Sequence, residues 1–145
     1  DTIQAAVLSV KLRHLADWTE RRRDVARGYL EGLAGVGDLV LPLEVESRRS
    51  CYHLFPVRTQ FRDDLRSFLA SEGIGTGIHY PRALPGLAAY QYLDQSTSAE
   101  RSTAWAGQLL SLPIGEHLSD QDVGIVVSAV RQFYVEHGEF QESLA

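Results

Sequence analysis

The sequence predicts an α/β domain of the α+β type, in which a small mixed sheet is covered by helices. Helical and strand periodicities alternate along the chain, the strands are short, and the connecting segments are uneven and rich in loops. The 145 residues are 44% hydrophobic, which is enough to bury one core but short for two. We therefore expect one domain over residues 1–145, with the element order α-β-α-β-α-β-α.

The first element is predicted to be a long helix over residues 2–33. Asp1 and Gln4 resemble a capping box at its start, and glycines follow its end. Apolar side chains recur at helical spacing in two adjoining stripes, which consist of Ile3, Val7, Val10 and His14 with Leu8, Leu12 and Leu15. So wide an apolar surface implies burial on more than one side. A bend is expected near Asp17.

The middle of the chain alternates between strand and helix patterns. Residues 51–59, CYHLFPVRT, have strand spacing, and Pro56 places that strand at an edge or at a bulge because proline lacks a backbone donor. A helix that ends at Gly73 follows. Its buried face is expected to consist of Leu65, Phe68 and Leu69. Residues 74–80 are predicted to form a second strand and residues 81–90 a loop, because prolines disfavour regular structure there.

The last part of the chain predicts a helix, a third strand and a terminal helix. Thr97 and Glu100 form a capping box for a helix to about Leu110, where the short strand LSLPI begins. Ser119 and Asp122 form the box that starts the last helix. The buried face of this helix is expected to consist of Val123, Val126, Val130 and Phe133.

The glycine-rich stretch GIGTGIHYP raises the question of a phosphate-binding loop. Such loops lie between a strand and a helix N-terminus, whereas these glycines follow a helix and precede a predicted strand. We therefore interpret Gly73 as a helix cap, and Gly75 and Gly77 as positions of close backbone approach or of a bulge. His79 and Tyr80 would point to opposite faces of the strand. On the residues alone, a structural histidine and a ligand-contacting one are equally good interpretations.

Composition and spacing exclude several other functions. The formal charge of −5 disfavours binding to nucleic acid or anionic lipid, and the arginines at 21–23 fit a helix face of alternating charge. No apolar run is long enough to span a bilayer, and one cysteine cannot form an internal disulfide, so a reducing, cytoplasmic compartment is expected. The five histidines lack the short spacing of metal ligands.

Cys51 and Lys11 are the candidate nucleophiles of the chain, and each has a structural interpretation. Cys51 and His53 would share a strand face, but a reactive cysteine needs a stabilised thiolate and an oriented base, so a buried structural cysteine is preferred. Lys11, the only lysine, lies among apolar neighbours on the first helix. We expect it to extend to solvent rather than to form a Schiff base.

Four segments together resemble, in order and spacing, the C-terminal part of the pyridoxal-phosphate-dependent sugar aminotransferases of the DegT/DnrJ family. They are DTIQAAVLSVKLRHLADWTERRRDVARGYLEGL, YHLFPVRT, FRDDLRSFLASEGIGTGIHYPRAL and LSLPIGEHLSDQDVGIVVSAVRQFY. The resemblance covers nearly the whole chain. It implies the C-terminal small domain of the aspartate-aminotransferase-like fold, including the first long helix and without the large cofactor-binding domain. The absence of methionine agrees with part of a longer product.

The resemblance also implies an activity for the complete protein. It implies a homodimer that uses pyridoxal phosphate to move an amino group from glutamate or glutamine to a nucleotide-linked keto sugar or a keto-cyclitol. Sugar, antibiotic or cell-surface polysaccharide biosynthesis would be its setting. The family's Schiff-base lysine and main cofactor contacts precede Asp1, and Lys11 does not match that lysine. We therefore expect no catalytic and no cofactor-binding residue in this chain, and no activity from it alone.

The site residues that the resemblance implies for this chain are substrate contacts. It implies that the GIHYP segment ends near the substrate entrance, which makes His79 and Tyr80 the expected contacts. Arg82 could offer a charge to a diphosphate, because a guanidinium forks onto phosphate oxygens. Many members continue as Pro-x-Pro-Leu-His, whereas Pro85 stands here where the second histidine is expected, which leaves the substrate open.

Two alternatives to a sugar aminotransferase stay open on the sequence. One is a non-catalytic homologue that acts as a binding or regulatory module. The other is a pyridoxal-phosphate-dependent dehydratase of the same fold. In every case the wide apolar first helix predicts association with another surface.

Overall fold

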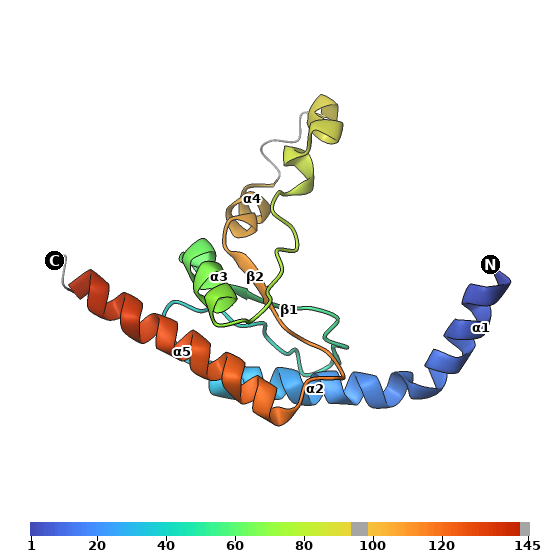
Figure 1. Ribbon diagram of the computed structural model, residues 1–145. Coiled ribbons are helices and arrows are strands. Elements are labelled where there is room, and N and C mark those ends of the chain that lie inside the picture. The colour runs from blue at the N-terminus through green and yellow to red at the C-terminus, as the bar shows by residue number, and fades with distance from the viewer. Residues whose placement is uncertain (94–98, 143–145) are drawn as a thin grey trace.

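The computed structural model describes residues 1–93 and 99–142 (Figure 1). Its helices are α1 (Thr2–Lys11), α2 (Leu15–Gly32), α3 (Arg62–Ser71), α4 (Glu100–Ala106) and α5 (Asp120–Glu142), its 3-10 segments are η1 (Leu12–His14), η2 (Leu84–Gly86) and η3 (Ala88–Leu93), and its strands are β1 (Phe55–Arg58) and β2 (Leu109–Leu112). Helices α2 and α5 lie side by side below the small sheet, and α3 packs against α5 and β2 (Figure 1). The predicted fold class is confirmed.

The sheet consists of two antiparallel strands. The register pairs Phe55 with Leu112, Pro56 with Ser111, Val57 with Leu110 and Arg58 with Leu109. On its other side, Arg58 exchanges two backbone hydrogen bonds with Val40, of 2.9 and 3.0 Å. Backbone N–H groups two residues apart on a strand point to the same side, so the nitrogen of Pro56, like that of Arg58, lies on the side away from β2. The missing N–H therefore costs no hydrogen bond to β2. The expected edge position of Pro56 is thereby confirmed.

The predicted second strand over residues 74–80 is wrong. Only Gly77 pairs with the sheet, through an isolated bridge to Ser111. The first residue of the segment, Ile74, is instead attached to the end of α3. Its backbone N–H donates to the carbonyl of Leu69 at 2.8 Å, and its side chain is buried. Gly75 and Gly77 also weaken a strand here, because they contribute no side chains to pack. The sheet therefore has two strands where three were expected.

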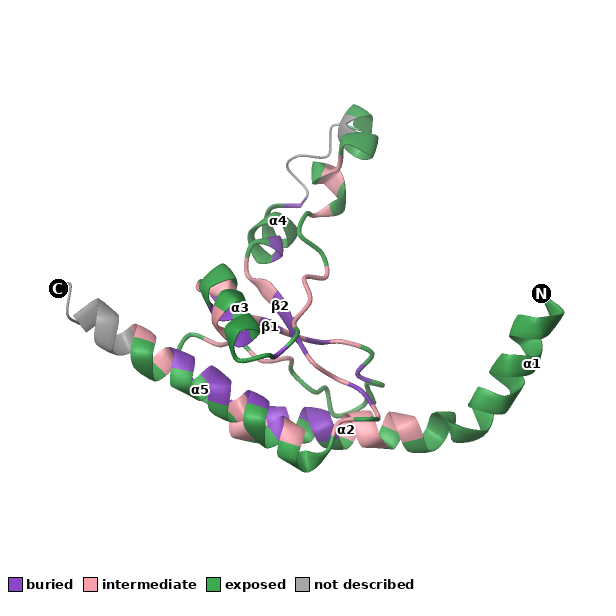
Figure 2. Ribbon diagram, viewed as in Figure 1, coloured by how far each residue is buried: buried purple, intermediate pink, exposed green. Residues whose placement is uncertain are grey.

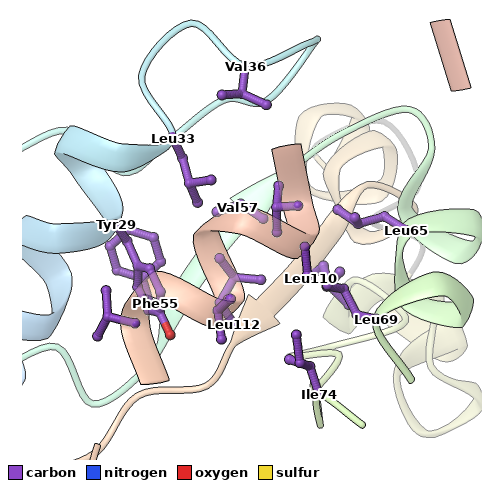
Figure 3. Close-up of a cluster of buried hydrophobic side chains, with 14 of the residues drawn as sticks. Tyr29, Leu33, Val36, Phe55, Val57, Leu65, Leu69, Ile74, Leu110 and Leu112 are labelled. Atoms are coloured by element: carbon purple, nitrogen blue, oxygen red, sulfur yellow. The ribbon is translucent and has the colours of Figure 1, made fainter. Parts of the chain in front are cut away.

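The core lies between the sheet and the helices, and every layer contributes to it (Figure 3). Its largest fully buried side chains are Val25, Tyr29, Leu33, Phe55, Val57, Leu65, Leu69, Leu110 and Val130. The hydroxyl of Tyr29 donates to the carbonyl of Pro113 at 2.8 Å, which satisfies the one polar atom of this buried ring. The predicted inward faces of α3 and α5 are confirmed, with Phe68 half-buried at the margin.

Two glycines allow α2 and α5 to approach closely. A Cβ at Gly28 would lie 2.9 Å from a methyl carbon of Val123, and one at Gly32 would lie 2.8 and 2.9 Å from both methyl carbons of Val127. Such distances are too short for carbon atoms in contact. The contact between these helices thus depends on the absence of two side chains on α2.

The start of α5 follows the predicted capping box. The Ser119 hydroxyl accepts from the backbone N–H of Asp122 at 3.1 Å, and the Asp122 carboxylate accepts from the backbone N–H of Ser119 at 2.7 Å. Hydrogen bonds from the Ser119 side chain and backbone hold the pKa of Asp122 below its usual value.

A polar network joins the loop after α2 to the end of β1 and to α5. Thr59 and Tyr134 both donate to one carboxylate oxygen of Asp38, at 2.6 and 2.7 Å, and the backbone N–H of Gln60 donates to the other at 2.7 Å. Burial by itself would raise the pKa of Asp38, but these hydrogen bonds outweigh it and hold the pKa below its usual value. The network ties together segments that are distant in sequence.

The first helix differs most from its prediction. The expected helix over residues 2–33 is interrupted by η1, a few residues before the expected bend at Asp17. No residue of α1 is buried, and Ile3 is 77% exposed, so the expected burial of its apolar stripes is not found in this chain (Figure 2). The reason is geometric: α1 projects beyond the sheet and α5, and none of the described elements lies opposite it (Figure 1).

Residues 81–90 contain regular structure that was not expected. They include η2 and the start of η3. Pro85 lies in the first turn of η2, where a backbone N–H is not yet required, so the proline is tolerated there.

Helix α4 ends earlier than predicted. It stops at Ala106, because Leu110 belongs to β2 and pairs with β1. Pairing with a distant strand thus overrides the local helical pattern. Thr97, the expected cap, lies outside the described residues, and the position before the helix is Ala99.

Candidate substrate-binding site

The segment that carries the predicted site residues is fixed to the middle of β2. Gly77 and Ser111 exchange two backbone hydrogen bonds, of 3.0 and 2.7 Å. A Cβ at Gly77 would lie 2.5 Å from Cε1 of His79, so a side chain, and not the backbone that was predicted, approaches this glycine closely. A side chain at Gly75 would meet open space. Gly73 has a φ of +76° just after α3, which confirms it as the helix cap.

His79 and Tyr80 have different surroundings, although they do not lie on a strand. His79 is half-buried, and its Nδ1 lies 3.0 Å from the hydroxyl oxygen of Ser111, a buried residue of β2. Tyr80 is 72% exposed, and its ring meets that of His79 edge to face, with 5.7 Å between the centroids. His79 therefore holds the segment to β2, while Tyr80 reaches outward.

A cavity of about 470 Å³ lies between this segment and α4. Its wall includes Tyr80, Arg82, Leu84, Ser102, Trp105 and Leu109. Two of the three predicted site residues, Tyr80 and Arg82, are therefore brought together, whereas His79 lies behind them and does not line the cavity. A mostly apolar wall with a few polar groups, and a volume of this size, are typical of small-molecule sites.

Trp105 is a residue of this site that the sequence did not reveal. The Arg58 guanidinium carbon lies 4.3 Å from the centre of the indole ring, and that side chain also donates to the Gln108 amide oxygen at 3.2 Å. Arg101 lies 5.9 Å away, one helical turn earlier on α4. Trp105 remains 40% exposed and lines the cavity. The spacing of Arg101 and Trp105 on a short helix was the available signal.

The nucleophiles considered from the sequence do not form a reactive centre. Cys51 is exposed, so the preferred interpretation of a buried cysteine is wrong. The physical reason is that β1 begins only at Phe55, while the preceding Tyr52 turns inward with a φ of 45° and donates to Glu44 at 2.6 Å. Cys51 and His53 therefore share no strand, and both lie exposed.

The chain does not fit the covalent site of a pyridoxal cofactor. Such a site needs an enclosed lysine beside groups that hold a phosphate. Lys11 lies on the exposed α1, with its Nζ 6.0 Å from the centre of the Trp18 ring. The described residues also form no group of three potential metal ligands among His, Cys, Asp and Glu.

The arginines at 21–23, in the middle of α2, each form an ion pair. Arg21 pairs with Asp120 at 2.8 Å, Arg22 with Glu116 at 2.8 Å, and Arg23 with Glu20. They thus act as ties to the start of α5 and to their own helix, in line with the interpretation as a face of alternating charge. None of the helices in the described part of the chain combines the length and apolar content that crossing a bilayer requires.

Comparison with known proteins identifies relatives along nearly the whole chain. The model of the DegT/DnrJ/EryC1/StrS aminotransferase family matches residues 1–131. The dTDP-3-amino-3,4,6-trideoxy-alpha-D-glucose transaminase of Streptomyces venezuelae is 42% identical over 134 residues, which are 92% of this chain and 35% of that protein. The pleiotropic regulatory protein of Geobacillus stearothermophilus is 40% identical over 140 residues, or 92% of this chain and 37% of that protein. The chain thus spans about a third of the length of these relatives.

Solved structures give the same assignment. S. venezuelae DesV, determined in complex with a ketimine intermediate, superposes with a TM-score of 0.85 at 40% identity, covering 90% of this chain and 36% of DesV. A DegT/DnrJ/EryC1/StrS aminotransferase from Brucella abortus superposes with a TM-score of 0.83 at 33% identity, covering 92% of this chain and 36% of that protein.

Proposed function

Because the chain belongs to the DegT/DnrJ/EryC1/StrS aminotransferase family, we propose that the complete protein is a sugar aminotransferase that depends on pyridoxal phosphate. It transfers an amino group from glutamate or glutamine to a nucleotide-linked keto sugar or a keto-cyclitol. The observation that carries this proposal is the 42% identity to a transaminase named for a dTDP-linked amino sugar. The cofactor supplies the chemistry of amino transfer when bound, and its lysine comes from outside this chain.

The contribution of this chain is to hold the substrate. Tyr80 and Arg82 line one cavity, where a phenol and a guanidinium are suited to sugar hydroxyls and to phosphate oxygens. His79 is bound to Ser111 through Nδ1, which leaves Nε2 as its nitrogen for a substrate contact. His79 does not line this cavity, so its part in the proposed site is to position Tyr80, and a substrate contact through Nε2 would lie outside the cavity.

We further propose that the complete protein is a cytoplasmic homodimer, in which other parts of the assembly cover α1. Six large apolar side chains of the α1 region are exposed, which exceeds what an isolated surface helix normally presents. Where α1 meets α2, a groove of about 350 Å³ is lined by apolar Leu8, Leu12, Leu15 and Trp18 together with charged Lys11, Arg22 and Glu116. Such a groove fits apolar side chains from another surface.

A regulatory protein without catalysis is the second candidate. It is supported by the name of the G. stearothermophilus relative, a pleiotropic regulatory protein. In that case the cavity beside Tyr80 would bind a small molecule without converting it.

An amino-transfer assay separates the two candidates. The complete gene product is incubated with pyridoxal phosphate, glutamate and a panel of dTDP- and UDP-linked keto sugars and keto-cyclitols. We expect amino sugar and 2-oxoglutarate in equal amounts, and no turnover by the 145-residue chain alone. Absence of turnover with the whole panel would favour the regulatory candidate. A cofactor absorbance of the 145-residue chain that borohydride fixes onto Lys11 would contradict the assignment of the lysine to another segment.

A further inference from the structure

We propose that Trp105 and Tyr80 form an aromatic platform for the base of a nucleoside diphosphate, with Arg82 contacting the diphosphate. This inference rests on the proposed function, since it assigns the nucleotide part of the substrate to the same cavity. It adds a residue from α4 that the motif around Tyr80 does not contain.

The two aromatic rings come from separate segments and line the same cavity. Tyr80 follows the Gly77 bridge, whereas Trp105 lies on the last turn of α4. Both rings are exposed in spite of their size, Tyr80 at 72% and Trp105 at 40%. Flat π-systems stack on nucleic bases with little regard to base identity, and a cation against the indole strengthens its role as a rigid wall. Arg58, 4.3 Å from the ring centre, supplies that cation.

The charge of the cavity suits a diphosphate rather than a neutral ligand. The chain as a whole carries −5, yet the charged side chain that the described residues contribute to the wall is the cationic Arg82. Arg82 follows Tyr80 by two residues, so a base on the rings and a phosphate on the guanidinium are within the span of one nucleotide. The volume of about 470 Å³ accommodates a ligand of this class.

The anchoring of the platform gives it a defined position. The Gly77–Ser111 bridge and the His79–Ser111 contact hold the Tyr80 side to β2. Arg58 on β1 holds the Trp105 side, because it contacts both the indole and Gln108. The two halves are thus attached to adjacent strands of the same sheet, which keeps their separation fixed.

Calorimetric titration of the complete protein with dTDP and UDP tests the platform. We expect Trp105→Ala to weaken binding by about tenfold or more, which is the range for losing one base stack, and Trp105→Phe to restore most of the affinity. Trp18→Phe is the matched control, since Trp18 stacks on His14 at the α1–α2 junction, 5.6 Å between ring centres, and does not line the cavity. Circular dichroism and thermal melts verify that each variant is folded.

Inorganic diphosphate separates the base from the phosphate contact. Its binding should be insensitive to Trp105→Ala but weakened by Arg82→Gln. Equal affinity of wild type and Trp105→Ala for dTDP and UDP, or no binding of either nucleotide to wild type, would overturn the platform. The amino-transfer assay distinguishes this failure from that of the proposed function. If wild type transfers amino groups while Trp105→Ala leaves the KM for the sugar nucleotide unchanged, only the platform is wrong.

Discussion

Helices α1 and α5 have similar apolar patterns and opposite surroundings. The apolar face of α5 is buried against α2, α3 and the sheet, whereas that of α1 is open along its whole length (Figure 2). The same periodicity thus predicted a covered face in both helices, correctly for α5 and not for α1 within this chain. A hydrophobic stripe indicates that one face of a helix is covered by another surface, but it does not indicate which segment or which chain provides that surface.

The contrast between these helices arises from what lies opposite them. Gly28 and Gly32 on α2 leave room for the valines of α5, so the two backbones come together. Helix α1 continues from the other end of α2, past the edge of the sheet (Figure 1). The difference between the two helices can be tested by substitutions. Their expected effects on the free energy of unfolding decrease from the core to the exposed α1.

Removal of a core ring should have the largest effect. Phe55 is fully buried between Tyr29 and Tyr52, with ring centres 5.1 and 6.0 Å away. We expect Phe55→Ala to lower the free energy of unfolding by about 3–5 kcal/mol, measured by urea denaturation. Ile3→Ala on α1 is the matched control and should change it by less than about 0.5 kcal/mol, because that side chain is exposed. A comparable loss in both would mean that α1 is packed in solution.

Filling the space between α2 and α5 should come next. Gly32→Ala would place a methyl group against both methyl carbons of Val127, so rotation of the valine brings no relief. We expect a loss of about 1–3 kcal/mol in the same denaturation experiment.

The matched control for this contact lies on α5. A Cβ at Gly124 would meet nothing within 4 Å, so Gly124→Ala should stabilise the helix by roughly 0.5–1 kcal/mol. Destabilisation by both alanines, or by neither, would show that the α2–α5 contact does not require the small residue.

Loss of the α5 cap should cost less. Ser119→Ala removes the acceptor for the backbone N–H of Asp122 and should lower stability by about 1 kcal/mol, with Ser119→Asp retaining most of it. The measurement is a pair of thermal and urea unfolding curves. An unchanged midpoint for the alanine variant would mean that α5 starts elsewhere in solution.

The Asp38 network predicts a modest dependence of stability on pH. Since the folded-state pKa of Asp38 is lowered, its contribution is fully present above the unfolded value of about 4 and is lost as the pH falls through the folded pKa. Asp38→Asn should therefore flatten the acid side of the stability profile below about pH 4, measured by urea denaturation at a series of pH values. A wild-type slope that the asparagine leaves intact would assign the acid sensitivity to another carboxylate.

Substitution on α1 should have the smallest effect on folding and its main effect on association. Leu8→Ser with Leu12→Ser should leave the unfolding free energy of this chain within about 0.5 kcal/mol, because both side chains are exposed. The unsubstituted 145-residue chain is expected to self-associate through this surface, and the double variant to do so less. Sedimentation equilibrium measures both. A wild-type chain that stays monomeric at high concentration would contradict the inferred need for a cover.

Local chemistry made part of the fold and of the site predictable. Gly73 ends α3 with a positive φ, and Ser119 with Asp122 starts α5, because each of these signals acts through neighbours within one turn. The placement of Tyr80 and Arg82 in a cavity also follows the order of their motif, although their contact with a substrate stays a prediction. Trp105 could not be found in this way, since it joins them from a segment about twenty residues later.

The sequence by itself thus predicted helices in the regions of α1 with α2, of α3, of α4 and of α5, the caps of α1, α3 and α5, two of the three expected strands, and the family of the chain. Only the tertiary structure decided that residues 74–80 contribute a single bridge, that α4 gives way to β2 after Ala106, and that α1 remains uncovered. The physical reason is the range of the interactions. Capping and periodicity act within a few residues, whereas strand pairing, helix contact and the walls of a cavity depend on residues that the chain brings together only when it folds.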